Sequence, residues 1–418
     1  MSDLGLTHQL QPAESQLPVN WYHDQAQFDL EQRLIFNRSP GALGYIGHEL
    51  MVPNAGDYHA IGWMNDALAL VRNERGVELI SNVCRHRQAI MLNGRGNLAP
   101  SGGNIVCPVH RWTYNNEGRL LGAPNFGANP CLDLHKVATH RWNGLVFNGP
   151  RDIAAELASL SVQNELKFDG FVLDRLHVHE CDYNWKTFIE VYLEDYHVEP
   201  FHPGLGQFVT CDDLQWQFAE RYSVQTVGVN NQLTKPGSAK YKTWHEQVLK
   251  YRGQHFDNPV PPHGAIWLTL YPNIMVEWYP HVLVVSHLIP RGPQKTTSIV
   301  EFYYPEDIAL FEREFVEAEQ AAYLETAVED DEIALRMDAG RRALIAQGIN
   351  QVGPYQTPLE DGMQHFHEYL RRELGPAANT AAASGTSGST IRSTIGLTSG
   401  LTSDATAVAS TVRPAASI

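Results

Sequence analysis

The sequence has little cysteine and no long hydrophobic run. Its 418 residues include five cysteines, at positions 84, 107, 131, 181 and 211. A sparse, odd set of this kind argues against a disulfide framework and favours a reducing compartment, with thiols that react or bind metal. No window reaches the roughly 18 uninterrupted apolar residues that a membrane-spanning helix needs. The opening residues, MSDLGLTHQLQPAESQ, lack the basic and apolar regions of a secretory signal, so we expect a cytoplasmic protein.

Basic residues are also in the minority. Asp and Glu number 47 against 31 Lys and Arg, which gives a formal net charge of -16. This excess of negative charge argues against a nucleic acid or an anionic membrane surface as the partner. With 43% apolar and 19% charged residues, the composition is that of an ordinary globular protein. The length allows two or three domains of about 150 residues each.

Composition and periodicity divide the chain into four parts. Residues 1–40 are predicted to form an N-terminal arm with a helix over Trp21–Phe36. Residues 41–150 contain short alternating runs separated by turn residues, the pattern of a small antiparallel β domain. Residues 151–374 form a second domain with longer elements. Residues 375–418 are small and polar without aromatic side chains, so they are predicted to be a disordered tail.

The second domain groups its strands together and surrounds them with helices. Helices are expected over 151–167 and 184–199, strands near 264–270, 274–279, 282–289 and 295–303, and closing helices over 306–328, 330–346 and 359–373. Elements grouped in this way indicate an α+β domain built on an antiparallel sheet.

Two cysteines and two histidines form the first candidate site, within the β domain. Cys84 and His86 have C-x-H spacing, and Cys107 and His110 follow with C-x-x-H spacing. Such a set suits tetrahedral zinc, or a [2Fe–2S] cluster with two thiolates on one iron and two imidazoles on the other. Zinc sites usually keep like ligands together, whereas each half here has one of each. The spacing and the flanks NVCRHRQA and IVCPVHRWTYNNEGRLLGAP resemble the Rieske [2Fe–2S] domain of ring-hydroxylating oxygenases.

A helix followed by two histidines forms the second candidate site. Residues 185–196 carry apolar side chains in steps of three and four, the pattern of a buried helical stripe. His197 lies at its end, Pro200 is predicted to end the helix, and His202 lies just beyond. Because residues five apart on an unbroken helix point about 140° apart, this break would allow the imidazoles to converge. Two imidazoles and one carboxylate make the facial triad of non-haem Fe(II) oxygenases.

The third ligand of this site is expected far along the chain. NWKTFIEVYLEDYHVEPFHPGL resembles the iron motif of Rieske non-haem iron oxygenase α subunits, and the resemblance extends over residues 40–370. In this family the third ligand is usually the Asp of a Glu-Asp pair that opens a helix. Asp330 fits that pattern, with Asp331 as the second candidate and Glu332 as the third. An acidic helix N-terminus is the alternative interpretation of these carboxylates.

The resemblance also implies a catalytic role for Glu194, three residues before His197. The family commonly has an Asp there, which links the iron histidine to a cluster histidine across a ring of three subunits. Glu194 is therefore expected to connect His197 with His110 of the partner subunit in a homotrimer. Some family monooxygenases that act on quaternary amines also have Glu here. Val191 stands where dioxygenases of the family have Asn, and both residues disfavour a naphthalene-dioxygenase-like reaction.

The resemblance implies both a fold and an activity. The fold is α+β, with a small antiparallel β Rieske domain and a larger helix-grip-like catalytic domain whose antiparallel sheet is covered by helices. The activity is that of a terminal oxygenase with a Rieske [2Fe–2S] cluster and a mononuclear Fe(II). It would use O2 to hydroxylate, dihydroxylate or oxidatively dealkylate a small aromatic or amine substrate, in a role such as aromatic hydrocarbon catabolism.

Electrons for this activity must come from another protein. The chain has no G-x-G-x-x-G after a strand and no ferredoxin-type cysteine run, so we expect a separate NAD(P)H-dependent reductase, acting directly or through a ferredoxin. Two alternatives are a Rieske-type electron-transfer protein without oxygenase activity and a zinc-binding module. The carrier would hold about two irons per chain and the oxygenase about three, whereas a zinc protein would be colourless.

The substrate pocket is expected along two strands and one helix. Residues 266–270 and 275–279, with helix residues near Tyr192, are the predicted lining. Their Trp and Tyr side chains could surround a cation or stack on an aromatic ring. An ordinary sheet core is the alternative interpretation of the same residues.

Overall fold

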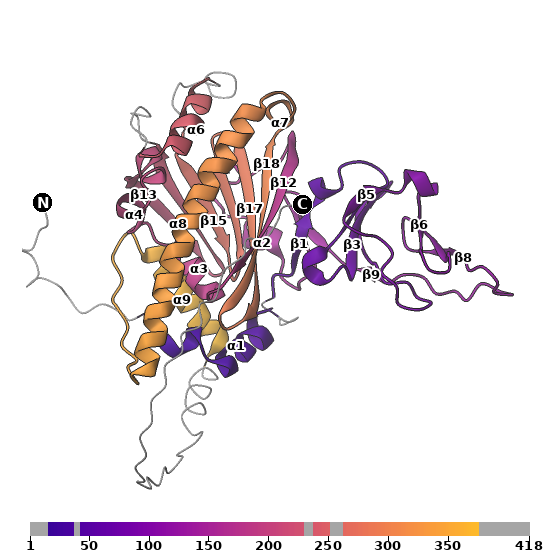
Figure 1. Ribbon diagram of the computed structural model, residues 1–418, viewed down its shortest axis with the longest axis horizontal. Helices are drawn as coiled ribbons and strands as arrows, with labels where there is room; N and C mark the ends of the chain where they lie inside the picture. Colours follow the sequence, from indigo (N-terminus) through magenta and orange to yellow (C-terminus); the bar gives the residue numbers. More distant parts are fainter. Residues whose placement is uncertain (1–15, 37–41, 230–236, 251–261, 376–418) are drawn as a thin grey trace, which may run out of the picture.

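The computed structural model describes residues 16–36, 42–229, 237–250 and 262–375, which form a smaller and a larger lobe (Figure 1). The smaller lobe consists of short antiparallel strands in sheets of three, five and three strands. The larger lobe is a seven-stranded antiparallel sheet with helices across one face. The predicted α+β class is therefore confirmed. No helix within the described ranges is long and apolar enough to cross a membrane.

The smaller lobe is assembled from eleven short strands among its described residues, joined by tight turns. They are β1 (Tyr45–His48), β2 (Asp57–Ala60), β3 (Leu68–Asn73), β4 (Gly76–Ser81), β5 (Arg95–Asn97), β6 (Asn104–Val106), β7 (Thr113–Asn115), β8 (Leu120–Gly122), β9 (Lys136–Val137), β10 (His140–Trp142) and β11 (Leu145–Phe147). The three-stranded sheet β6–β7–β8 lies at the outer end of this lobe (Figure 1). β1, β10 and β11 form the sheet nearest the larger lobe and contribute Tyr45 and Phe147 to a core shared with it.

The larger lobe is built on one wide sheet. Its strands, in spatial order, are β12 (Phe171–Cys181), β18 (Lys295–Pro305), β17 (Val282–Gly292), β16 (Ile274–Tyr279), β15 (Ala265–Leu270), β14 (Tyr222–Val229) and β13 (Val209–Ala219). The four strands β15–β18 were predicted from their apolar runs. The prediction missed β12 and β13, which are the edge strands and carry polar residues on both faces, and β14, whose alternation YSVQTVGV was a usable signal.

One long helix covers the inner face of this sheet. α8 (Arg313–Ala346) runs unbroken for 34 residues and follows the short α7 (Glu306–Phe311). The predicted division into 306–328 and 330–346 is wrong, because the acidic run at 329–332 resembles a helix start but no Gly or Pro interrupts the helix there. Asp330 consequently lies in the middle of a helix rather than at its first turn.

Other helices differ from prediction in extent. Only α2 (Ile153–Glu156) forms within the predicted helix 151–167, and α6 (Ala239–Lys250), which packs on α8, was not predicted. The predicted closing helix 359–373 corresponds to α9 (Asp361–Leu374).

The helix that precedes the histidines ends earlier than predicted. α3 (Trp185–Tyr192) begins after Asn184, whose side chain accepts a hydrogen bond from the Lys186 N–H. The chain leaves the helix after Tyr192 and forms a separate single turn, α4 (Val198–Phe201). Pro200 lies inside α4, where the first turn of a helix tolerates proline, and is not the residue that ends α3. The break still has the expected result, because His197 and His202 flank α4 and face each other.

The N-terminal arm packs against the larger lobe. It comprises the turn η2 (Val19–Tyr22), the helix α1 (Gln25–Glu31) and the wider turn η3 (Gln32–Phe36), close to the predicted helix. Glu31 on α1 pairs with Lys186 on α3 at 2.8 Å, and both side chains are fully buried. A buried pair of this kind fixes the arm to α3, because separating it would leave a charge without a partner. The predicted tail, apart from Gly375, lies outside the described residues.

Candidate active site and metal centres

The first site is formed by two loops at the end of the smaller lobe. Cys84 and His86 follow β4, and Cys107 and His110 lie between β6 and β7. The two thiols are buried, and the rings of the two histidines lie 4.6 Å apart. Burial raises the pKa of the Cys107 thiol, so the thiolate form needs positive charge nearby. A buried cysteine pair beside an outer histidine pair fits the ligand set of a Rieske cluster, with one iron for each pair.

Neighbouring aromatic residues support these loops. Trp112 stacks on His86 at 5.0 Å with the ring planes 5° apart, and Phe126 meets the same imidazole edge-on. The Tyr114 hydroxyl lies 3.6 Å from the Cys84 sulfur and accepts a hydrogen bond from the Arg85 N–H at 3.2 Å. Groups of this kind orient metal ligands and tune a cluster's potential. The sequence analysis did not assign them, although WTY follows the second ligand loop directly.

Removing one of the two histidines is expected to abolish the cluster. In His86→Ala or His110→Ala the outer iron would have a single protein ligand, too few to retain it. We expect the purified variants to lose the red-brown colour and the EPR signal of a reduced Rieske centre, while Trp112→Phe retains both with a shifted potential. A native Rieske spectrum in either histidine variant would contradict this ligand assignment.

The second site brings together three side chains from two segments. The Nε2 atoms of His197 and His202 lie 2.9 Å apart. Asp330 Oδ1, on α8, lies 3.4 Å from His197 Nε2 and 3.0 Å from His202 Nε2. Two imidazole nitrogens and a carboxylate oxygen that converge in this way form the donor set of a 2-His-1-carboxylate metal site. The residues present therefore fit a mononuclear Fe(II).

Each histidine of this site is held from behind by a carboxylate. Glu194 contacts His197 Nδ1 and also accepts a hydrogen bond from the His197 backbone N–H at 3.1 Å. Glu329 Oε2 lies 2.7 Å from His202 Nδ1. A carboxylate that accepts the Nδ1–H leaves Nε2 free to bind metal and fixes the ring orientation. Glu194 was a predicted residue, whereas the role of Glu329 was missed, because the sequence pattern treats it only as the residue before Asp330.

The electrostatics of this site favour a positive charge. Burial lowers the pKa of His197, but the carboxylates of Asp330 and Glu194 outweigh this and raise the pKa to about 10. Asp330 and Glu329 raise the pKa of His202 against the same effect of burial. Positive charge is thus stabilised between the imidazoles and Asp330, and a divalent iron supplies it without a proton.

The two other carboxylates considered for this position point elsewhere. Asp331 lies 2.7 Å from His179 Nε2 and accepts a hydrogen bond from the Tyr183 hydroxyl at 2.6 Å. Glu332 is exposed and pairs with Arg336 on the surface. Successive residues of a helix point about 100° apart, so only one of the three can face the histidines. The structure brings Asp330 to them.

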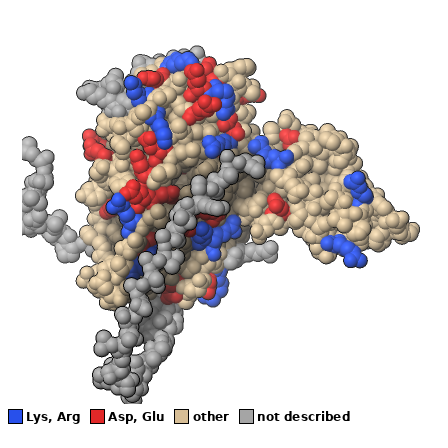
Figure 2. Space-filling model, in the orientation of Figure 1, with Lys and Arg blue, Asp and Glu red and all other residues tan. Residues whose placement is uncertain are grey.

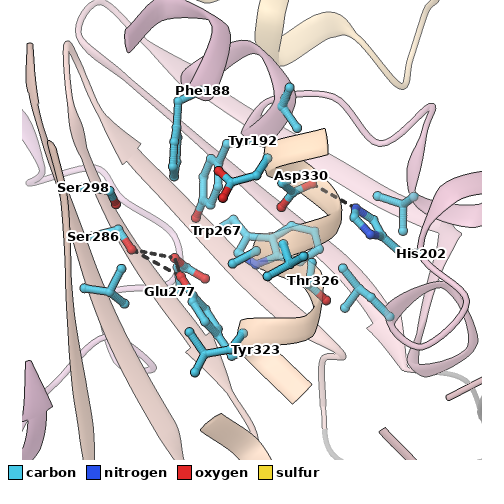
Figure 3. Close-up of a pocket in the computed structure, with 18 of the residues that line it drawn as sticks. Phe188, Tyr192, His202, Trp267, Glu277, Ser286, Ser298, Tyr323, Thr326 and Asp330 are labelled. Carbon is cyan, nitrogen blue, oxygen red and sulfur yellow. Dashed lines mark hydrogen bonds and ion pairs between the residues drawn. The ribbon is translucent and has the colours of Figure 1, made fainter. Parts of the chain in front are cut away.

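A cavity of ≈ 350 Å³ adjoins this triad, between α8 and the sheet (Figure 3). None of the described residues that line it is Lys or Arg, whereas six are carboxylates: Glu194, Asp195, Glu277, Glu319, Asp330 and Asp331. Aromatic side chains form much of the remaining wall, among them Trp267, Tyr192 and Tyr323 (Figure 3). An acidic, aromatic cavity suits a small organic cation.

Only part of the predicted lining faces this cavity. Trp267, Glu277, Tyr279 and Tyr192 line it. The alternating residues Ile266, Leu268, Leu270, Val276 and Trp278 point to the opposite face and pack in the core shared with the smaller lobe. Both interpretations of these strands therefore hold, one for each face of the sheet.

Comparison with known proteins identifies both halves of the chain. Residues 44–139 match the family model of the Rieske [2Fe–2S] domain, and residues 168–375 match that of the ring-hydroxylating α subunit catalytic domain. A putrescine 2-hydroxylase of Ralstonia nicotianae is 60% identical over 372 residues, which cover 89% of this chain and 99% of the relative. A putrescine 2-hydroxylase of Bordetella bronchiseptica is 56% identical over 386 residues, covering 90% and 88%.

A solved structure agrees with the fold. The crystal structure of a quaternary ammonium Rieske monooxygenase in complex with an inhibitor aligns with a TM-score of 0.67 at 19% identity, covering 87% of this chain and 96% of that one. A Rieske domain followed by an iron-binding catalytic domain defines the class of terminal oxygenases. The chain belongs to the family of Rieske non-haem iron oxygenases that includes the ring-hydroxylating α subunits.

Family membership decides several alternatives. The cofactors are a Rieske [2Fe–2S] cluster and a mononuclear iron, so the zinc module is excluded. The match to the catalytic domain favours the terminal oxygenase over a pure electron-transfer protein. A role in aromatic hydrocarbon catabolism is not supported, because the similar relatives are named for putrescine.

Members of the family work with a separate reductase and form multimers. Bound by the residues described above, the cluster would store one electron, and the iron would supply another and provide open positions for O2 beside the substrate.

Proposed function

We propose that the chain is the oxygenase component that hydroxylates putrescine, or a closely similar aliphatic diamine, at C2. The two relatives at 60% and 56% identity carry the name of this activity. The observation in the structure that carries the proposal is the cavity beside the triad, whose described lining has six carboxylates and no Lys or Arg. Glu194, Asp330 and Asp331 contact histidines of the chain. Burial raises the pKa of Asp195 and of Glu277 to about 7 and that of Glu319 to about 8, so a diamine, which is doubly charged at neutral pH, would stabilise the ionised forms of these three.

Within this proposal, residues 41–150 hold the electron store and residues 151–374 the oxygenation site. Cys84, His86, Cys107 and His110 bind the cluster. His197, His202 and Asp330 bind the mononuclear iron. Glu194 and Glu329 orient the two iron histidines. The reaction takes a substrate C–H bond, one O2, two electrons and two protons to a C–OH group and water, and the electrons come from an NAD(P)H-dependent reductase, directly or through a ferredoxin.

We further propose a homotrimer in which the cluster of one subunit serves the iron of the next. The cluster loops lie at the outer end of the smaller lobe, away from α3, α4 and α8 (Figure 1). Apolar side chains are exposed near both sites: Val109 and Phe126 beside the cluster, and Tyr196 beside His197. The face of the smaller lobe seen in Figure 2 also carries few charged side chains. A closed ring would join these surfaces through one repeated interface.

A substrate panel tests the proposed reaction. The purified protein, supplied with NADH and a Rieske oxygenase reductase, is expected to couple O2 uptake to 2-hydroxyputrescine, identified by mass spectrometry. Asp330→Ala serves as the inactive control, and naphthalene as the aromatic comparison. Turnover of naphthalene with no product from putrescine would contradict the proposal.

A further inference from the structure

One carboxylate of the cavity is placed differently from the others. Glu277 stands in the middle of β16, at the centre of the sheet, and its side chain is 1% exposed. It points into the same cavity as Asp330, and the two lie on different sides of it (Figure 3). No hydrogen bond among the described residues joins Glu277 to the triad. Glu277 is therefore available for a role other than holding the metal.

The partners of Glu277 are all neutral hydroxyl groups. Tyr279 donates to Oε2 at 2.8 Å, Tyr323 donates to Oε1 at 2.9 Å, and Ser286 donates to Oε1 at 3.3 Å. Figure 3 shows Ser286 and Tyr323 beside Glu277. A carboxylate has about four acceptor positions, so one on Oε2 is left. Burial raises the pKa of Glu277 to about 7, although the three hydroxyls favour its charged form. A cation beside it would stabilise that form further.

Other buried carboxylates in this protein show what is unusual here. Glu31 pairs with Lys186, and Glu190 pairs with Arg341, so these two have a cation of the chain itself. Glu301 is the closest analogue of Glu277: it is fully buried and accepts hydrogen bonds from the hydroxyls of Tyr45 and Tyr303. Glu301 does not line the cavity, whereas Glu277 does. Glu319 also lines the cavity and accepts a hydrogen bond from the Tyr304 hydroxyl. Glu277 differs from it in accepting hydrogen bonds from three hydroxyl groups and in lying on the sheet rather than on α8.

The walls around Glu277 also suit an ammonium group. Trp267 Nε1 donates to the Tyr279 hydroxyl at 2.9 Å, which directs the Tyr279 hydrogen towards Glu277. The Tyr279 ring lies 6.3 Å from that of Tyr323 at 87° and 6.4 Å from that of Trp267 at 72°. Aromatic faces arranged at right angles attract a cation and pack against methylene groups.

We propose that Glu277 binds the ammonium group of the substrate that is remote from the iron, between the rings of Tyr279, Tyr323 and Trp267. This inference rests on the proposed amine hydroxylation. The aliphatic chain of the diamine then spans the cavity, with the reacting carbon near the triad and the far nitrogen at Glu277. Glu277 accordingly distinguishes a diamine from a monoamine.

Two substrates and two matched variants test this. In the wild type, kcat/KM for putrescine is expected to exceed that for butan-1-amine, which lacks the remote ammonium, by about 100-fold. Glu277→Gln should lower kcat/KM for putrescine by about 100-fold and leave butan-1-amine nearly unchanged, so that the preference disappears. Glu301→Gln, which changes an equivalent carboxylate outside the cavity, should keep the preference. Iron content and the Rieske spectrum establish that each variant is loaded.

A shorter carboxylate gives a second, independent test. Glu277→Asp withdraws the acceptor by one methylene, about 1.5 Å. We expect this variant to prefer 1,5-diaminopentane to putrescine, the reverse of the wild type. Unchanged preferences in both Glu277 variants, with an active wild type, would overturn the role of Glu277 alone. A loaded wild type that hydroxylates no diamine would overturn the proposed function as well.

Discussion

Replacing Asp330 with Ala is expected to lower product formation by at least about 10³-fold, which is about 4 kcal/mol of transition-state stabilisation. Within the part of the chain that the structure describes, Asp330 Oδ1 is the one carboxylate oxygen that lies near the Nε2 atoms of both His197 and His202. Without it, two imidazoles remain, too few for a stable facial site. Metal analysis should find about two irons per chain in place of about three, with the Rieske EPR signal intact.

Neighbouring residues on α8 provide the controls for this variant. Glu332→Ala removes an exposed carboxylate that pairs with Arg336, so iron content and turnover should stay at wild-type values. Asp331→Ala should also keep its iron, because Asp331 bonds to His179 and Tyr183. If Asp331→Ala lost the mononuclear iron and Asp330→Ala kept it, the ligand assignment would be wrong by one residue.

Changing Glu194 to Gln is expected to slow electron delivery to the iron by about 100-fold while both metal centres stay occupied. Glu194 contacts His197 at its Nδ1 and is only partly buried, at 13% exposure of its side chain. In the proposed trimer, its carboxylate would accept a second hydrogen bond from His110 of the partner subunit, whereas an amide has one acceptor oxygen and would orient both rings poorly. Single-turnover oxidation of the reduced cluster, with substrate and O2 present, measures this rate.

Glu329→Gln is the matched comparison for Glu194→Gln. It changes the same chemistry behind the other iron histidine, since Glu329 lies 2.7 Å from His202 Nδ1. We expect it to weaken iron binding by about 10-fold to 100-fold without slowing cluster oxidation in the loaded fraction. Equal rates of cluster oxidation in the wild type and Glu194→Gln, or a fully active monomer, would refute the bridge between subunits.

Local spacing made most of the candidate ligands predictable. Cys84 with His86, and Cys107 with His110, each lie within one short loop, so their convergence depends on few residues between them. His197 and His202 are separated by a single turn of helix. Asp330 could be predicted as the third ligand only from the resemblance to a family. The two histidines that it meets lie more than 120 residues away in the sequence, and the four successive carboxylates 329–332 are all candidates for the position.

The residues that support the ligands could not be read from spacing. The contact of Glu329 with His202 spans 127 residues, and that of Tyr114 with Cys84 spans 30. β15 and β16 are buried on both faces, so their sequences do not reveal which side faces a cavity. Glu277 lay within the predicted lining, and its sequence context also pointed to a binding role, because a lone acid in the middle of an otherwise uncharged strand is costly to bury unless it binds something.

The predicted helix boundaries were wrong where the local sequence favours one boundary and tertiary packing favours another. The acidic run 329–332 favours a helix start, yet α8 continues through it and packs on α3 and α6, with Ala334 buried against Tyr183 and Val191. Pro200 suggested the end of α3, but the chain turns earlier, at 193–197, where the Asp195 N–H donates to the Leu359 carbonyl at 2.9 Å. The site depends on both of these tertiary choices.

A single turnover under ¹⁸O2 tests the central claim most directly. The protein is loaded with both metals, reduced chemically, freed of reductant and mixed with putrescine and ¹⁸O2 in the absence of any reductase. Each chain then holds two electrons, one at each centre, which is the number that hydroxylation of one substrate requires. The account predicts close to one 2-hydroxyputrescine per chain, labelled with ¹⁸O, together with oxidation of the cluster. Oxidation of the cluster without labelled product would contradict it.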